Sequence, residues 1–153
     1  MTLRIYVAGS SKDIDRCERA ITQCREAGMI ITEDWVATMR ASPPDHLLDE
    51  ERILAAAIAD IRGVESADVV WLLAPPASKP SAGCWAEMDR ALTRRIPVVY
   101  SPPPVEKPQF CIFTCLIETG TEPRSTQGFI CGSDEEAFAI LQAMAEGADT
   151  RVT

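Results

Sequence analysis

Three apolar segments, separated by segments with helical spacing, place the tightest constraint on the fold. Residues 67–74 form an almost continuous apolar run, typical of a parallel strand buried on both faces. Residues 3–8 and 96–100 predict two more strands. Residues 14–27 and 83–93 carry apolar side chains three and four positions apart, which predicts helices that each bury one face. Strands that alternate with helices in this way favour a parallel sheet with right-handed crossovers.

The remaining segments extend the same alternation. We therefore expect a single Rossmann- or flavodoxin-like α/β domain over residues 1–147, with a mainly parallel central sheet, helices on both faces and a frayed tail over 148–153. The other expected elements are a short strand at 29–32, a helix at 46–63, strands at 111–117 and 128–131, and a helix at 133–146.

Composition excludes several classes of function. A chain of 153 residues with a net charge of −8 is one acidic domain, which argues against a nucleic-acid-binding surface. No apolar run approaches the roughly 20 residues of a membrane helix, and no signal peptide is recognisable, so we expect no membrane partner and a cytoplasmic location. The six cysteines resemble reduced thiols, and Cys111, Cys115 and His46 do not make a zinc pattern. We expect neither a metal nor a cofactor.

Ligands of open parallel sheets bind outside the carboxyl ends of the strands. This rule selects the turn at residues 9–12, the segment at 75–87 and the loop that begins at Ser101. Glu87 lies in the first turns of a helix that starts at this edge, so its carboxylate is the main candidate for chemistry.

Two spacings strengthen the case for Glu87. Gly83 stands four positions before it and Ala91 four positions after it. In the first strand, Tyr6 precedes Gly9 by three positions. Each spacing alone is a weak signal, and the ordered set in its strand and helix context is stronger.

Two further patterns complete the set. The pair Asp34 and Trp35 follows the second strand, and Asp60 precedes Asp68 by eight positions at the end of a helix. Over about residues 3–100 the chain resembles the nucleoside 2-deoxyribosyltransferase-like superfamily, which includes deoxyribosyltransferases and 2′-deoxynucleoside 5′-phosphate N-hydrolases. The resemblance implies cleavage of the N-glycosidic bond of a (deoxy)nucleoside or its 5′-monophosphate, with transfer of the sugar to water or to another base.

The resemblance also implies roles for individual residues. Glu87 would be the nucleophile, because a carboxylate beside C1′ stabilises or captures the positive charge that develops on the sugar. The Tyr6 hydroxyl would orient that carboxylate. Asp60 is the better candidate to protonate the leaving base. Asp68 lies at the opposite end of its strand, and we expect it to be structural.

Substrate contacts are expected at the same edge of the sheet. Ser81 stands where free-nucleoside transferases often have an aspartate and nucleotide hydrolases a serine, which favours a 5′-monophosphate, since a hydroxyl accommodates a phosphate that a carboxylate repels. Ser81 could equally cap the following helix. Trp35 could stack on a base. The expected substrate-binding residues are Gly9, Ser10, Ser11, Trp35, Ser81 and Gly83.

Two alternatives stay open. The same fold could act as a non-catalytic nucleotide-binding or sensor domain, which the departures from the family pattern at Trp85 and Asp89 would permit. A phosphoribohydrolase would need a longer glycine-rich run before the glutamate than this chain has. The resemblance further implies a homodimer or higher homo-oligomer, with the loop at 101–108 a candidate contributor across the interface.

Overall fold

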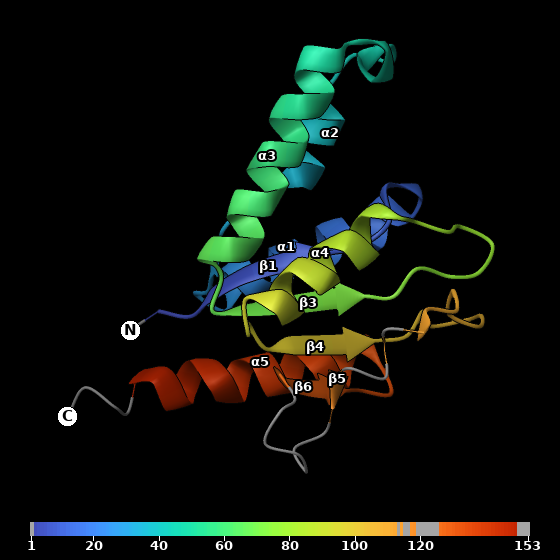
Figure 1. Cartoon of the computed structure of the whole chain (residues 1–153). Coiled ribbons are helices and arrows are strands. Elements are labelled where there is room, and N and C mark those ends of the chain that lie inside the picture. The colour runs from blue at the N-terminus through green and yellow to red at the C-terminus, as the bar shows by residue number, and fades with distance from the viewer. Residues whose placement is uncertain (1, 113, 115–116, 119–125, 150–153) are drawn as a thin grey trace.

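A parallel β-sheet forms the centre of the molecule. In the computed structural model, which describes residues 2–112, 114, 117–118 and 126–149, the strands lie in the order β2-β1-β3-β4-β6-β5. Every pair of neighbours is parallel. This arrangement confirms the expected Rossmann-like α/β fold (Figure 1). The strands are β1 (Arg4–Ala8), β2 (Ile30–Ile31), β3 (Val69–Leu73), β4 (Val98–Ser101), β5 (Ile117–Glu118) and β6 (Thr126–Ile130).

Helices cover both faces of the sheet, and alternate residues of each strand face different helices. On one face, Val7 and Trp71 share a core with α1 (Ile14–Glu26) and α5 (Asp134–Asp149). On the other face, Tyr6 and Leu72 pack in a core with α4 (Gly83–Thr93) and the buried end of α3 (Glu50–Ser66). The two-residue period of a strand therefore directs Tyr6 towards α4, where Glu87 lies.

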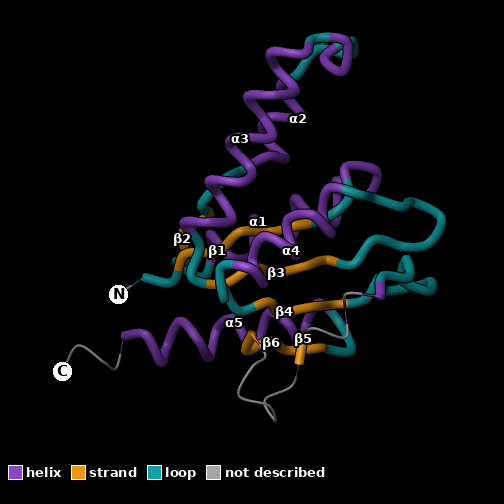
Figure 2. The backbone as a smooth tube through the Cα atoms, in the orientation of Figure 1, coloured by secondary structure: helices purple, strands orange, loops and turns teal. Residues whose placement is uncertain are grey.

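Helices α2 (Trp35–Ala41) and α3 rise together from the sheet and form an arm (Figures 1 and 2). Where α3 meets the sheet, Gly63 and Val64 are buried. A Cβ at Gly63 would come within 2.5 Å of the Glu33 Cβ and 2.9 Å of the Tyr6 ring, so this close approach of α3 to β1 requires glycine. Farther out, Leu54, Ile58 and Ile61 are exposed by 62%, 40% and 45%.

The arm differs in detail from the sequence prediction. The helix expected over 46–63 begins instead at Glu50, after a short 3₁₀ turn at His46–Leu48, and runs three residues further, to Ser66. The Asp49 side chain accepts a hydrogen bond from the Arg52 amide, which sets this start. Helix α2 was not expected, because it has only seven residues and one buried side chain, and its start depends on the Asp34 side chain, which accepts from the Ala37 amide.

The carboxyl-terminal part also needs correction. The strand expected over 111–117 is wrong for most of its described length: the Thr114 amide and hydroxyl both donate to the Cys111 carbonyl and close a turn, and β5 begins only at Ile117. The next strand begins at Thr126 rather than 128. Helix α5 continues to Asp149, beyond the expected domain end at 147, and the rest of the predicted tail lies outside the described residues.

A buried arginine ties together the edge of the sheet where β3 and β4 end. The Arg16 guanidinium, 3% exposed, makes two hydrogen bonds to the Asp134 carboxylate and donates to the carbonyls of Ala74, Ser101 and Pro102. A buried cation is tolerable only with such full pairing. The result is a fixed edge, next to which the segment at 75–81 passes. Among the described helices, none is long and apolar enough to cross a membrane.

Candidate active site

A tyrosine and a glutamate from segments far apart in the sequence meet at the centre of the candidate site. The Tyr6 hydroxyl donates a 2.8 Å hydrogen bond to Glu87 Oε1. The other carboxylate oxygen, Oε2, is buried and has no hydrogen-bond partner among the residues that the structure describes. An unpaired buried carboxylate oxygen is costly in a folded protein, and such groups cluster where chemistry is done.

Local sequence explains why these two groups meet. Cys84, Met88 and Ala91 form the buried stripe of α4, and Glu87 lies beside it, so its carboxylate turns towards the sheet. Tyr6 is fully buried in β1 and extends from the same side of the sheet. The expected pairing of Tyr6 with Glu87 is confirmed.

Asp60 approaches the same pair from α3. The pKa of this half-buried carboxyl is raised to about 6, first by burial and then by the negative charge of Glu33, while hydrogen bonding with Tyr6 acts in the opposite direction. Glu33 precedes the Asp34–Trp35 pair and was not among the expected site residues.

Burial also changes the pKa of the central pair. It raises the pKa of Glu87 to about 8; the hydrogen bond from Tyr6 lowers it and the charge of Asp60 raises it further. The pKa of the Tyr6 phenol lies well above its ordinary value, because of burial and the charges of Glu87 and Asp60. Tyr6 therefore remains a hydrogen-bond donor. From about pH 6 to about pH 8, the two carboxyls together hold one proton.

The carboxyls line a cavity of about 860 Å³ between the arm and the edge of the sheet. Asp60, Glu87 and Glu33 lie at its inner end. The wall formed by the arm is largely apolar and includes Met39 and Ile53. This volume is that of a ligand site, since small-molecule sites occupy roughly 300–1,000 Å³.

Most of the expected substrate-binding residues line this cavity. They are Gly9, Ser11, Trp35, Ser81 and Gly83. The Trp35 indole nitrogen donates to the Val7 carbonyl at 2.8 Å, which fixes the ring against the end of β1. Ser81 Oγ is 3.5 Å from the Cys84 amide, at the limit for capping α4, so the hydroxyl retains capacity for another partner.

Ser10 departs from the expectation. It is 2% exposed and is not part of the cavity lining. Its hydroxyl oxygen accepts from the Lys12 amide and donates to the Lys79 carbonyl, because the chain turns directly into the helix that follows β1. Ser10 thus shapes the turn that presents Gly9 and Ser11.

Asp68 occupies the structural position that was expected. Its carboxylate accepts from the Arg4 guanidinium at 2.8 Å and from the Arg4 amide at 2.9 Å. This pair lies at the start of β1 and β3, whereas Gly9 and Ser81 of the cavity lining follow the ends of these strands. The arginine holds the pKa of Asp68 below its usual range.

Gln109 is a second residue that sequence reasoning missed. Its side-chain oxygen accepts from the Ser81 amide at 2.9 Å and from the Trp85 indole at 3.0 Å. The backbone amide of Gln109 donates to the Pro75 carbonyl. The proline-rich loop over 101–108 contacts the same segment within the chain, since Ser78 Oγ donates to Glu106 and the Ala77 amide donates to the Lys107 carbonyl.

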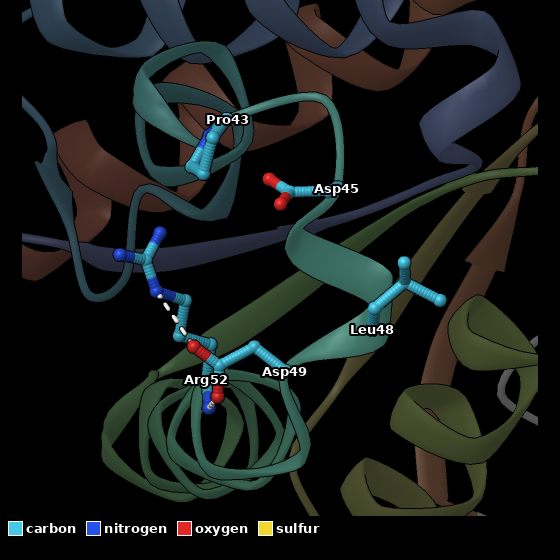
Figure 3. A pocket seen from close by; sticks show the side chains of 5 residues that line it. All are labelled: Pro43, Asp45, Leu48, Asp49 and Arg52. Carbon is cyan, nitrogen blue, oxygen red and sulfur yellow. Dashed lines mark hydrogen bonds and ion pairs between the residues drawn. The ribbon is translucent and has the colours of Figure 1, made fainter.

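A second cavity, of about 310 Å³, lies at the tip of the arm (Figure 3). Arg52 forms an ion pair with Asp49 there, at 3.0 Å between Nε and Oδ2. The carboxyl pair Asp60 and Glu87 does not line this cavity. It is therefore not the candidate active site.

Comparisons with known proteins identify the fold. No family model matches the chain, and no curated protein matches it. Among solved structures, a conserved protein from Enterococcus faecalis V583 matches with a TM-score of 0.55 and 18% identity, over 94% of this chain and 99% of that one. At this identity the likeness establishes the α/β architecture alone.

Within the described residues, no group of three or more histidine, cysteine or acidic side chains is arranged to hold a metal ion. The cavity presents several polar groups of its own. These are two carboxyls that share a proton, a tyrosine that donates to one of them, and hydroxyls and backbone amides at the start of α4. Such a set suits general acid and nucleophilic catalysis on a small polar substrate.

Proposed function

We propose that this protein cleaves the N-glycosidic bond of a (deoxy)nucleoside or its 5′-monophosphate, with Glu87 as the nucleophile. The observation that carries the proposal is the hydrogen bond from Tyr6 to Glu87 Oε1, which leaves Oε2 unpaired in a carboxylate that lines the large cavity. An oriented carboxylate with one free oxygen is what an electron-poor sugar carbon requires.

The reaction has two steps. In the first, Glu87 Oε2 forms a bond to C1′ as the bond from C1′ to the base nitrogen breaks, and Asp60 transfers its proton to the leaving base. In the second, water attacks C1′, the bond to Glu87 breaks, and the water proton returns to Asp60. A second base in place of water gives base exchange. Tyr6 holds the Glu87 carboxylate in position throughout.

The carboxyl pair has the proton count that this assignment needs, with the proton resting on Glu87, the group of higher pKa. Glu87 must be ionised to attack and Asp60 must be protonated to donate, so the reactive pair holds one proton. Between about pH 6 and about pH 8 the two carboxyls hold one proton, and the reaction requires that this proton pass from Glu87 to Asp60 before the attack.

A 5′-monophosphate is the favoured substrate form. Ser11, Ser81 and Gly83 line the cavity near the start of α4, where hydroxyls and backbone amides can donate to phosphate oxygens. Lys12 lies in the same region, and its ammonium donates to the Pro80 carbonyl at 3.2 Å. These groups fit an anion better than an uncharged hydroxymethyl group.

We also propose that the chain acts in the cytoplasm as a homodimer or higher homo-oligomer. Leu54, Ile58 and Ile61 repeat at helical spacing on α3 and are exposed, and a stripe of this kind is typical of a surface that packs against another chain. The cysteines in the described segments carry free thiols, which suits a reducing compartment. Sedimentation of wild-type protein and of Ile58→Glu tests the assembly: the variant should be smaller, and equal masses would contradict this interface.

The activity is tested by chromatography for free base. Purified protein is incubated with deoxynucleosides and with their 5′-monophosphates, each with and without an added acceptor base. Base released from monophosphates alone supports a nucleotide hydrolase, and base exchange on free nucleosides supports a transferase. If neither occurs while these compounds still raise the melting temperature, the catalytic proposal is wrong and the domain is a nucleotide-binding module.

A further inference from the structure

The two ends of the large cavity differ in chemistry. At the inner end lie the carboxyls of Glu33, Asp60 and Glu87. At the arm end the lining is mainly apolar, with Met39 from α2, Leu47 before α3, and Ile53 together with the alanines at positions 55–57 from α3. A ligand that fills the whole cavity must therefore be polar at one end and apolar at the other.

Helix α3 runs from one end of the cavity to the other. Ile53, Ala56 and Asp60 are separated by three and four residues, so they lie along one side of the helix, and all three line the cavity. The seven residue steps from Ile53 to Asp60 correspond to about 10 Å along the helix axis. The apolar wall thus lies next to Asp60 on α3 and extends from there towards the tip of the arm.

An unmodified nucleotide would leave much of this space empty. The cavity, at about 860 Å³, lies towards the upper end of the roughly 300–1,000 Å³ seen for ligand sites. With C1′ at Glu87 and the leaving nitrogen at Asp60, the sugar and phosphate face the start of α4, and the far edge of the base faces the arm. The polar edge of an ordinary base would find no hydrogen-bond partner on a wall of Met39, Ile53 and Ala56 side chains.

Arg52 does not make the arm end suitable for a phosphate. It lines the outer part of the cavity, but its guanidinium is paired with Asp49 and is more than half exposed. The carboxyls of Glu33 and Asp60 contribute negative charge at the inner end. An apolar group next to the base would pack against the side chains at the arm end and would not be repelled by the carboxylates.

On the basis of the proposed function, we infer that the substrate is a nucleoside 5′-monophosphate whose base carries a bulky apolar or aromatic substituent, held by the wall of Met39, Ile53 and Ala56. The substituent lies along α3 and is removed from water by the arm. Its recognition is apolar, so it adds affinity without a new hydrogen bond.

The test measures binding separately from turnover. Glu87→Gln protein is titrated by calorimetry with two matched pairs of ligands: dAMP and N6-benzyl-dAMP, and dCMP and N4-benzyl-dCMP. We expect at least one benzylated nucleotide to bind tenfold or more tightly than its parent. Equal or weaker binding of both benzylated compounds, or no binding of any of the four, overturns the inference.

A second substitution locates the apolar group. Ala56→Trp, added to the Glu87→Gln protein, should remove the advantage of the benzylated ligand and leave the affinity for its parent within about threefold. Ala37→Trp is the matched control, because Ala37 is exposed on α2 and is not part of the cavity lining. If Ala56→Trp does not fold, Ile53→Ala should reduce the same advantage, and an unchanged preference in the folded variant places the substituent elsewhere.

Turnover then separates the two proposals. Wild-type protein that releases base from the parent nucleotides as efficiently as from the benzylated ones supports the N-glycosidase and contradicts the apolar substituent. Tight binding of a benzylated nucleotide without release of any base has the opposite meaning: the inference on the ligand holds and the catalytic proposal fails.

Discussion

Tyr6 and Glu87, 81 positions apart in the sequence, are joined by a 2.8 Å hydrogen bond at the base of the large cavity. The bond fixes one carboxylate oxygen, while the other, Oε2, has no hydrogen-bond partner in the described part of the chain. It also links β1 to α4 on the face of the sheet that α3 covers. The predictions below follow from this bond and from the groups around it.

Glu87→Gln should reduce base release by a factor of 10³ or more, because an amide cannot form the bond to C1′. The amide has nearly the same shape and still accepts from Tyr6, so circular dichroism should show an unchanged fold. Asp89→Asn is the matched control, since Asp89 lies on the same helix and is exposed. Near-wild-type activity of Glu87→Gln would remove the proposed nucleophile.

Tyr6→Phe should lower kcat by about 10- to 100-fold, because a charge-assisted hydrogen bond contributes about 1.5–3 kcal/mol. The bond from Tyr6 lowers the pKa of Glu87, so its loss should raise that pKa. The limb of the pH–rate profile that reports Glu87 should therefore move to higher pH. A variant that loses activity with an unchanged profile would show that Tyr6 has only a packing role.

The pH–rate profile of kcat/KM should be bell-shaped, with limbs near pH 6 and pH 8, because only the singly protonated carboxyl pair is reactive. Glu33→Gln removes a negative charge that raises the pKa of Asp60, so the low-pH limb of the profile should move to lower pH. The measurement is initial rates from pH 4.5 to 9.5. Glu106→Gln, on the exposed part of the proline-rich loop, is the control and should leave both limbs in place.

The free energy of unfolding should fall as pH rises through the pKa of Glu87. The pKa of this carboxyl is about 8 in the folded protein and 4.5 in its ordinary state, so the folded protein binds the proton more tightly. The resulting stabilisation is complete below about pH 4.5 and is lost as pH rises towards 8. Urea unfolding should show a loss on the order of a few kcal/mol in wild type. The same titration of Glu87→Gln should be flatter, and parallel curves would contradict the raised pKa.

Gly63→Ala should destabilise the protein by about 1–3 kcal/mol, because the added methyl meets the Glu33 Cβ at 2.5 Å and the Tyr6 ring at 2.9 Å. The strain falls on two residues of the candidate site, so activity should drop as well. Gly147→Ala in α5 is the comparison: its added methyl has open space, and alanine favours a helix. Equal stability of the two variants would show that α3 can shift away from β1 without cost.

Sequence patterns were sufficient for the elements with strong periodicity. The apolar run at 67–74 and the helical stripe of α4 are decided by local burial, so β3 and α4 lie where they were expected. Helix α2 was not predictable in this way, since it buries only Val36 and depends on one cap. The turn at Cys111 and Thr114 is likewise set by two local hydrogen bonds that no periodicity reports.

The residues of the candidate site also fall into two groups, those that the sequence indicated and those that it did not. Tyr6, Asp60 and Glu87 could be selected because a resemblance orders them along the chain, and the fold brings them together. Glu33 and Gln109 act through tertiary contacts: one alters the pKa of Asp60 and the other holds the start of α4. Neither contact leaves a signal in a single sequence.

Helix α3 is continuous from Glu50 to Ser66, about 25 Å in length. It carries Ile53 and Ala56 of the apolar wall together with Asp60, and Gly63 lies against Tyr6 where the helix meets the sheet. The position of Asp60 relative to the apolar wall is therefore set by the geometry of one helix. An insertion of one residue between Ala56 and Asp60 would turn the two halves of the helix by about 100° relative to each other and move Asp60 out of line with the apolar wall. The shape of the cavity therefore depends on the number of residues between Ala56 and Asp60 as well as on their identity.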